Sequence, residues 1–138
     1  KQAGFWTKQA VDVVFLENTA YNHRPSNSSE GVCMGGQYAP ERVWFVANRL
    51  WNCDVGIRLS SDNGLGIGTY QFIVGNIISQ VHDTVGAWNP GSGWTPCAIS
   101  IQGGTNRYVV ANTLNDVGAG GVEFLHGVTK VNFGGVRA

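Results

Sequence analysis

The hexapeptide VWFVAN, residues 43–48, sets a pattern that recurs along the chain. Matching segments end in an asparagine each time, and they read VVFLEN at 13–18, QFIVGN at 71–76 and YVVAN at 108–112. The terminal asparagines Asn18, Asn48, Asn76 and Asn112 are separated by 30, 28 and 36 residues. Self-similarity at this period is typical of a repeat architecture in which each unit stacks on the next.

Two further segments keep the same register within each unit. A polar residue follows each asparagine at an interval of four positions, at Asn22, Asn52, Gln80 and Asp116. A short apolar segment comes later in each unit, at 31–34, 56–59, 98–101 and 121–124. The segments alternate with period two and are rich in β-branched and aromatic residues, which favour strands. The sequence therefore predicts an all-β chain with three short strands per turn and almost no helix.

Three strands per turn, with Gly and Asn at the corners, describe a parallel β-helix (solenoid) of about four to five coils. At one corner the asparagines would form a ladder, because each side-chain amide reaches the next one about 4.8 Å away. The chain resembles the right-handed parallel β-helix superfamily, which includes pectate-lyase-like proteins and related carbohydrate-binding and sugar-hydrolase repeats. We expect residues 1–138 to form one domain with uncapped ends, either a slice of a longer β-helix or a stacking subunit. A β-sandwich is the alternative.

Composition restricts the classes of function. Nine Lys and Arg balance nine Asp and Glu, so no basic field is present to attract nucleic acid or anionic lipid. No stretch approaches the roughly 20 apolar residues of a membrane-spanning helix. The His and Cys residues do not have the spacing of a zinc site, so we expect no metal and no cofactor, apart from calcium if the protein is a lyase. A disulfide between Cys53 and Cys97 would join corresponding loops and leave Cys33 unpaired.

Strand alternation predicts which side chains face the core. If the segment before each asparagine is the second strand of its coil, as the resemblance implies, Trp44 and Phe72 point inward. The same phase leaves an outward apolar stripe, made of Phe15, Phe45, Ile73 and Val109. A stripe of this kind is an association surface, so we expect another subunit, further coils or flanking loops to cover it. On the first strand, we expect Val32 to point inward and Cys33 outward.

The resemblance places a polysaccharide substrate along the outer face of the first-strand sheet. The loops at 22–30 and 81–97 are long and the loop at 53–55 is short, so two walls would flank a low coil that carries Arg58. For a polysaccharide lyase, the resemblance implies Arg58 as the base, with His82 and Asp83 assisting and Glu123 on the same face. The expected substrate-binding residues are Ser100, Gln102, His126, Trp88, Trp94, His23 and Arg24. A glycoside hydrolase needs two convergent carboxylates, and only Glu123 is expected there, so the lyase is favoured.

Three functions from different classes remain open. The first is a polysaccharide lyase or hydrolase that is part of an extracellular or cell-surface β-helix protein. The second is a noncatalytic carbohydrate-binding or adhesive module, similar to a spike. The third is a structural solenoid that stacks into fibres through its ends. The predicted fold does not decide between them, because function resides in sites carried by a fold.

Overall fold

The computed structural model describes residues 3–26, 29–60, 68–83, 96–118, 120–125 and 129–137. Within these residues the chain is all-β, without a helix, and most strands belong to three parallel sheets. Sheet A contains β1 (Ala3–Lys8), β6 (Val32–Gln37), β9 (Val55–Ser60), β12 (Cys97–Gln102) and β15 (Val122–Leu125). Sheet B contains β2 (Val11–Leu16), β7 (Glu41–Val46), β10 (Thr69–Val74), β13 (Thr105–Val110) and β16 (Thr129–Gly134). Sheet C contains β3 (Thr19–His23), β8 (Arg49–Cys53), β11 (Ile77–Val81) and β14 (Thr113–Val117).

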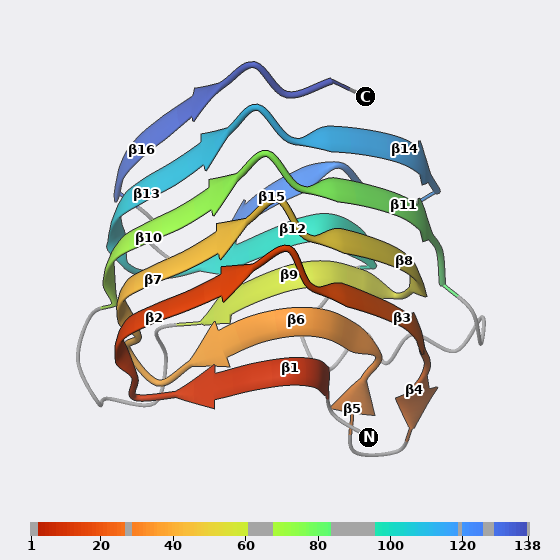
Figure 1. The fold of residues 1–138 in the computed structure, drawn as a ribbon, viewed down its shortest axis with the longest axis horizontal. Helices are drawn as coiled ribbons and strands as arrows, with labels where there is room; N and C mark the ends of the chain where they lie inside the picture. Colours follow the sequence, from red (N-terminus) through yellow and green to blue (C-terminus); the bar gives the residue numbers. More distant parts are fainter. Residues whose placement is uncertain are drawn as a thin grey trace.

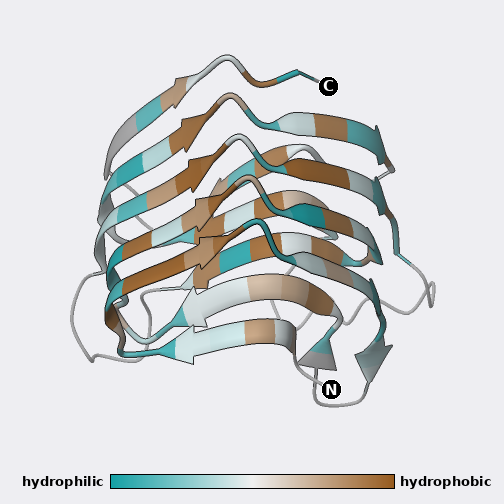
Figure 2. Cartoon of the chain, in the orientation of Figure 1, coloured by the Kyte–Doolittle hydropathy of each residue, from teal (hydrophilic) through white to brown (hydrophobic). Residues whose placement is uncertain are grey.

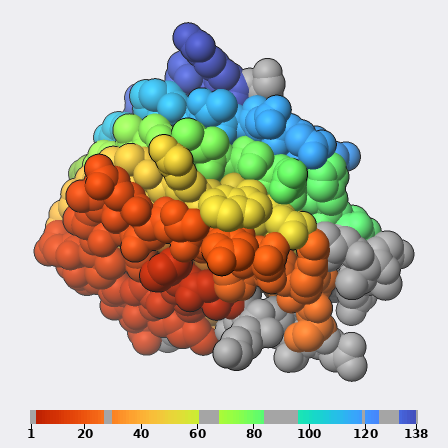
Figure 3. All heavy atoms as spheres, turned by 45° about the vertical axis from the view of Figure 1, so that its right-hand side comes forward, coloured from red at the N-terminus to blue at the C-terminus, as the bar shows by residue number. Residues whose placement is uncertain are grey.

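The chain passes through sheets A, B and C in turn, so equivalent strands of successive windings lie side by side (Figure 1). In the space-filling view the windings form bands that run in sequence order from red to blue (Figure 3). A short antiparallel hairpin, β4 (Pro25–Ser26) with β5 (Ser29–Glu30), interrupts the path from sheet C to the next strand of sheet A. The parallel arrangement of three sheets is consistent with the predicted β-solenoid.

Buried asparagines connect the windings at the bend between sheets B and C. The amide oxygens of Asn48, Asn76 and Asn112 each accept two hydrogen bonds from the asparagine one winding earlier, at 2.9–3.1 Å. The donors are that residue's backbone N–H and its side-chain amide. Each of the three Nδ2 groups also donates to a backbone carbonyl on the neighbouring strand of sheet B, one winding earlier, at 2.8–2.9 Å. These bonds satisfy backbone groups that the bend removes from the strand ladders.

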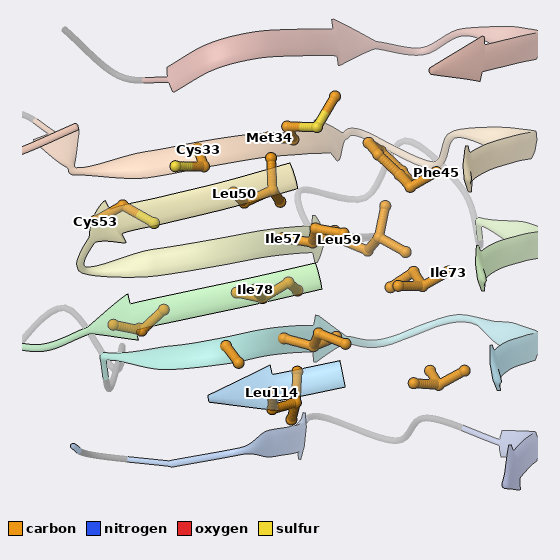
Figure 4. Packing of buried hydrophobic residues seen from close by; sticks show 14 of the residues in the cluster. Cys33, Met34, Phe45, Leu50, Cys53, Ile57, Leu59, Ile73, Ile78 and Leu114 are labelled. Atoms are coloured by element: carbon orange, nitrogen blue, oxygen red, sulfur yellow. The ribbon is translucent and has the colours of Figure 1, made fainter. Parts of the chain in front are cut away.

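The hydrophobic core fills the space that the three sheets enclose. Equivalent positions of successive strands supply the same kind of side chain, so hydrophobic residues recur from strand to strand (Figure 2). Figure 4 shows these side chains directed from all three sheets toward one another. The fully buried members include Met34, Phe45, Leu50, Ile57, Leu59, Ile73, Ile78, Ile99, Ile101 and Val109. One row of side chains therefore packs on the next through the interior that the three sheets enclose.

Residues in the left-handed backbone region form three rows that run from winding to winding. The row members are Asp12, Arg42, Tyr70 and Asn106; Glu17, Ala47, Gly75 and Ala111; and Asn22, Asn52, Gln80 and Asp116. The non-glycine members have φ between 49° and 60°. Asn and Asp tolerate this region better than other L-residues, which explains why polar residues recur four positions after each core asparagine.

The expected facing of the second strand is wrong. Phe45, Ile73 and Val109 are fully buried in the core, and Phe15 packs against it. The outward stripe proposed from these four residues therefore does not exist. The alternation fails because a left-handed residue, Ala47 or its equivalent, stands between the strand and each asparagine and shifts the phase by one position.

The residues that do line the outer face of sheet B include a row of aromatic rings. Trp44 and Phe72 stack with centroids 5.2 Å apart, and Phe72 and Tyr108 stack with centroids 4.6 Å apart. The ring planes are nearly parallel, at 2° and 11°. Val14 occupies the same register and is 58% exposed. Because the rings cover one another's faces, this row presents mainly ring edges to its surroundings.

The expected facing of the first strand is partly wrong. Cys33 lies in the core with no exposed surface, whereas Val32 belongs to a separate apolar cluster on the outer face of sheet A, with Trp6. Consecutive residues Cys33 and Met34 both join the core because sheet A bends toward sheet C at this point. The equivalent position in β9 is Gly56, where an added Cβ would lie 2.6 Å from the side chain of Ile78 in sheet C.

Candidate functional site

The outer face of sheet A carries a row of chemically active side chains in one register. Trp6 pairs with Gly35, Gly35 with Arg58, Arg58 with Ser100, and Ser100 with Glu123. Neighbouring strands in a sheet lie about 4.8 Å apart, so the row runs across the strands along the solenoid axis. The core-facing residues Ile57 and Leu59 flank Arg58, which leaves the guanidinium on the outer side. The structure thus brings together three residues that the sequence placed on this face.

Arg58 is held by a carboxylate from the hairpin. Its Nη1 forms an ion pair with Oε2 of Glu30, the last residue of β5. The Arg58 side chain is 5% exposed and that of Glu30 is 22% exposed. A guanidinium keeps its proton throughout the ordinary pH range. Arg58 therefore serves as a fixed cation rather than as a proton acceptor.

Glu123 is the second carboxylate on this face. The Ser100 hydroxyl donates a hydrogen bond to Glu123 Oε2 at 3.2 Å. The Cys97 thiol contacts the same oxygen at 3.9 Å. Burial, and next the negative charge of Glu123, raise the pKa of Cys97 to about 12. Cys97 is consequently a neutral thiol at physiological pH, and Ser100 fixes the position of the half-buried Glu123.

Trp6 closes the other end of the row. Its indole ring lies over Gly35, where an added Cβ would come within 2.3 Å of the ring and 2.4 Å of the Arg58 carbonyl oxygen. The ring packs against the outer apolar cluster of Ala3, Val32, Val55 and Cys97. Gly35 is therefore required here, because any side chain would displace the indole.

Three buried polar atoms on this face have no hydrogen-bond partner in the part of the chain that the structure describes. They are the indole Nε1 of Trp6 and the amide oxygens of Gln37 and Gln102. Gln37 and Gln102 end β6 and β12, one residue beyond the core positions Gly36 and Ile101. An orphaned buried polar group costs about 1–3 kcal/mol, so such groups usually have a water or ligand partner.

The row has the chemistry of a polar binding surface. The row and its hairpin contain two carboxylates, Glu30 and Glu123, and one guanidinium, Arg58, which leaves a negative balance among these three groups. Carboxylate and amide oxygens accept hydrogen bonds, and the indole N–H donates one. An aromatic ring beside such groups provides an apolar contact surface. Together they can bind a ligand that carries both hydroxyl groups and apolar patches.

Other predicted site residues lie away from this row. His82 Nε2 lies 3.3 Å from Asp116 Oδ1 of sheet C, and Asp83 follows His82 as an exposed residue. The Arg24 guanidinium donates to Asn52 Oδ1 at 2.6 Å, which directs Arg24 toward sheet C. His23 ends β3 near Gly4, and burial lowers the pKa of its imidazole.

Trp88, Trp94 and His126 lie outside the described residues. Within the described ranges, no group of three or more His, Cys, Asp or Glu side chains is placed to hold a metal ion. In the same part of the chain, no helix is long and apolar enough to cross a membrane.

Sequence reasoning missed Glu30, Trp6 and Cys97 as members of the site. The length of the 22–30 loop indicated a wall beside Arg58, but its folding into a hairpin that ends at Glu30 had no signal in the alternation pattern. Trp6 precedes the first complete repeat, so no neighbouring unit defined its register. Comparisons with protein-family models, with curated proteins and with solved structures each find no match to this chain.

Proposed function

We propose that the chain is a right-handed parallel β-helix of about four to five coils, in which Asn18, Asn48, Asn76 and Asn112 form a ladder. The hydrogen bonds between successive asparagines support this assignment. Core-type aromatic side chains remain accessible in the first and last windings, with Phe5 36% and Phe133 54% exposed. We propose that further coils or other subunits stack on these ends.

We propose that the protein binds polysaccharide at the outer face of sheet A, where the partly exposed Trp6, Glu30 and Glu123 border the buried Arg58 and Ser100. The observation that supports this most directly is the set of orphaned polar atoms on that face, at Trp6, Gln37 and Gln102. These atoms lie beside the row from Trp6 to Glu123, which runs across the windings and matches an extended ligand rather than a compact one. Sugars present hydroxyl groups that pair with carboxylate and amide oxygens, and apolar C–H faces that pack on indole. Such a protein would act outside the cell or at the cell surface.

The charge of the site favours neutral sugars over uronates. Glu30 and Glu123 supply two carboxylates, and only Arg58 opposes them among the groups of the row. A polyuronate would bring further carboxylates to a surface that is already negative, and like charges at short range repel. A neutral polysaccharide has no such penalty, because its hydroxyl groups donate to the same oxygens.

Recognition without catalysis is the better proposal for this site. The lyase hypothesis assigned the base to Arg58, but that guanidinium is nearly inaccessible and paired with Glu30. Hydrolysis is a second candidate, because Glu30 supplies the additional carboxylate that the sequence pattern lacked. In a hydrolase one carboxylic acid would protonate the leaving oxygen while the other carboxylate acts as base or nucleophile.

The test measures binding and turnover with the same variants. A panel of immobilised neutral and acidic polysaccharides is probed with the wild-type chain and with Glu123→Gln. Removing a charged hydrogen-bond acceptor should weaken affinity for a neutral polysaccharide about tenfold. Glu17→Gln is the matched control, because Glu17 is an exposed residue at the bend after sheet B.

The two candidates give different readouts. Binding without release of reducing sugar supports recognition alone, whereas release that disappears in Glu123→Gln supports hydrolysis. Release of an unsaturated, ultraviolet-absorbing product would instead support the lyase. Equal affinity of wild type and Glu123→Gln for every polysaccharide would contradict the placement of the site on sheet A.

A further inference from the structure

Two cysteines from different sheets meet inside the solenoid. Cys33 is the second residue of β6 in sheet A, and Cys53 is the last residue of β8 in sheet C. Both side chains have no exposed surface and belong to the same core cluster. Figure 4 shows the two side chains at the same end of the core, Cys33 on β6 and Cys53 on β8.

The contacts of Cys33 place its sulfur against the inner side of sheet C. Its thiol lies 3.4 Å from the carbonyl oxygen of Ala20 and 4.0 Å from that of Trp51, two residues before Cys53 in β8. The neighbouring Cys33 thiol, followed by burial, raises the pKa of Cys53 far above its usual value. The two thiols are therefore direct neighbours in a dry environment.

Cys97 is excluded from this pair by the topology. It belongs to the outer cluster of sheet A, where its sulfur contacts Glu123. Cys53 lies in the interior cluster on the other side of that sheet. The disulfide between Cys53 and Cys97 considered from the sequence would have to pass through sheet A, and Cys33, expected to be the unpaired thiol, is the residue that faces Cys53.

We propose that Cys33 and Cys53 form a disulfide when the chain folds in an oxidising environment, and that Cys97 stays a free thiol. All three cysteines are thiols in the structure described here. The oxidant is a low-molecular-weight disulfide such as oxidised glutathione. One protein thiolate attacks it and releases one glutathione thiol, and the second protein thiolate displaces the other, so two S–H groups become one S–S bond.

Burial determines when the bond forms. A thiol without exposed surface and with a raised pKa is a poor nucleophile, because the thiolate is the reactive form. The exchange therefore takes place before sheets A and C close over the pair, and the finished bond is protected from reductants. It would close a loop of about 20 residues and tie two sheets together, which should raise the unfolding midpoint by about 10 °C.

The experiment refolds the wild-type chain with reduced and oxidised glutathione, alkylates the remaining thiols in denaturant and maps the peptides by mass spectrometry. The expected result is one cross-linked peptide pair that contains Cys33 and Cys53, with alkylated Cys97. Cys97→Ser should keep the cross-link and the gain in unfolding midpoint, whereas Cys33→Ser should lose both.

Several outcomes would overturn the proposal. These are alkylation of both Cys33 and Cys53 after oxidative refolding, glutathione adducts in place of the cross-link, or a cross-link that includes Cys97. The mapping on wild-type protein is decisive even where Cys33→Ser does not fold. It is also independent of any sugar, so its result does not depend on the proposed polysaccharide site.

Discussion

Truncation of Asn76 to alanine should destabilise the protein far more than truncation of Asn18, although both residues belong to the same row. The Asn76 side chain takes part in four hydrogen bonds and has no exposed surface. It donates to Phe45 O and Asn112 Oδ1, and it accepts from the backbone and side-chain nitrogens of Asn48. The Asn18 side chain makes one hydrogen bond in the described part of the chain, from Nδ2 to Asn48 Oδ1.

The loss in free energy of unfolding depends on which polar groups each truncation leaves without a hydrogen-bond partner. Without the Asn76 amide, Asn48 Nδ2 still donates to Phe15 O, and Asn112 Oδ1 still accepts from the Asn76 backbone. The backbone N–H of Asn48 and the carbonyl of Phe45 lose their side-chain partner, at about 1–3 kcal/mol each. We therefore expect Asn76→Ala to lower the free energy of unfolding by about 4 kcal/mol, and Asn18→Ala by about 1 kcal/mol.

Urea unfolding followed by circular dichroism measures both variants, and calorimetry gives the midpoints. For a chain of this size the expected shifts are about 12 °C for Asn76→Ala and about 3 °C for Asn18→Ala. Equal shifts would refute the reasoning, because they would mean that the stacked amides contribute no more inside the row than at its end. A change in m-value rather than in midpoint would also contradict it, since the loss would then arise in the unfolded state.

Two further predictions concern the backbone, and a third concerns the half-buried imidazole of His23. Gly56→Ala places a Cβ 2.4 Å from Ala98 O and should lower the unfolding midpoint by about 6 °C, whereas Gly134→Ala, which meets nothing within 4 Å, should leave it unchanged. In the left-handed row at the bend after sheet B, Gly75→Ala should lower the free energy of unfolding by about 1 kcal/mol, and Ala47→Gly should raise it by about 0.5 kcal/mol. A stabilising Gly75→Ala or a destabilising Ala47→Gly in urea titrations would contradict the backbone argument. Burial lowers the pKa of His23, so the unfolded chain binds more protons than the folded chain, and the free energy of unfolding falls as the pH drops below about 6.5. His23→Gln should therefore make the urea midpoint depend less on pH between about pH 7 and pH 5.

The sequence predicted those features that repeat with a residue type. The asparagines at 18, 48, 76 and 112 mark a bend because a side-chain amide can accept from one neighbour and donate to another at that spacing. The strands were recognisable from the alternation of apolar residues, and the shared register of Arg58, Ser100 and Glu123 followed from the repeat.

Features that depend on the backbone alone were not predictable in the same way. The left-handed residue before each asparagine is Glu17, Ala47, Gly75 or Ala111, and only the glycine signals its conformation. If the alternation of side chains is continued across the bend without this residue, the phase is wrong by one position. The prediction therefore exchanged the inner and outer faces of sheet B. The partner of Arg58 was missed for a related reason, because the hairpin that ends at Glu30 interrupts the repeat and has no counterpart in the other windings.

The central strands of sheet A, β6, β9 and β12, are buried on both faces except at Gln37. Parallel sheets commonly have two covered faces, but these are usually apolar on both sides. Here the inner face is apolar, whereas the outer face holds the ion pair of Arg58 and Glu30 and the orphaned amide oxygen of Gln102. A buried ion pair adds little net stability over a well-packed apolar pair, and an orphaned oxygen subtracts from it. An apolar outer face would therefore stabilise the same fold better, which fits the proposal that a ligand completes these hydrogen bonds.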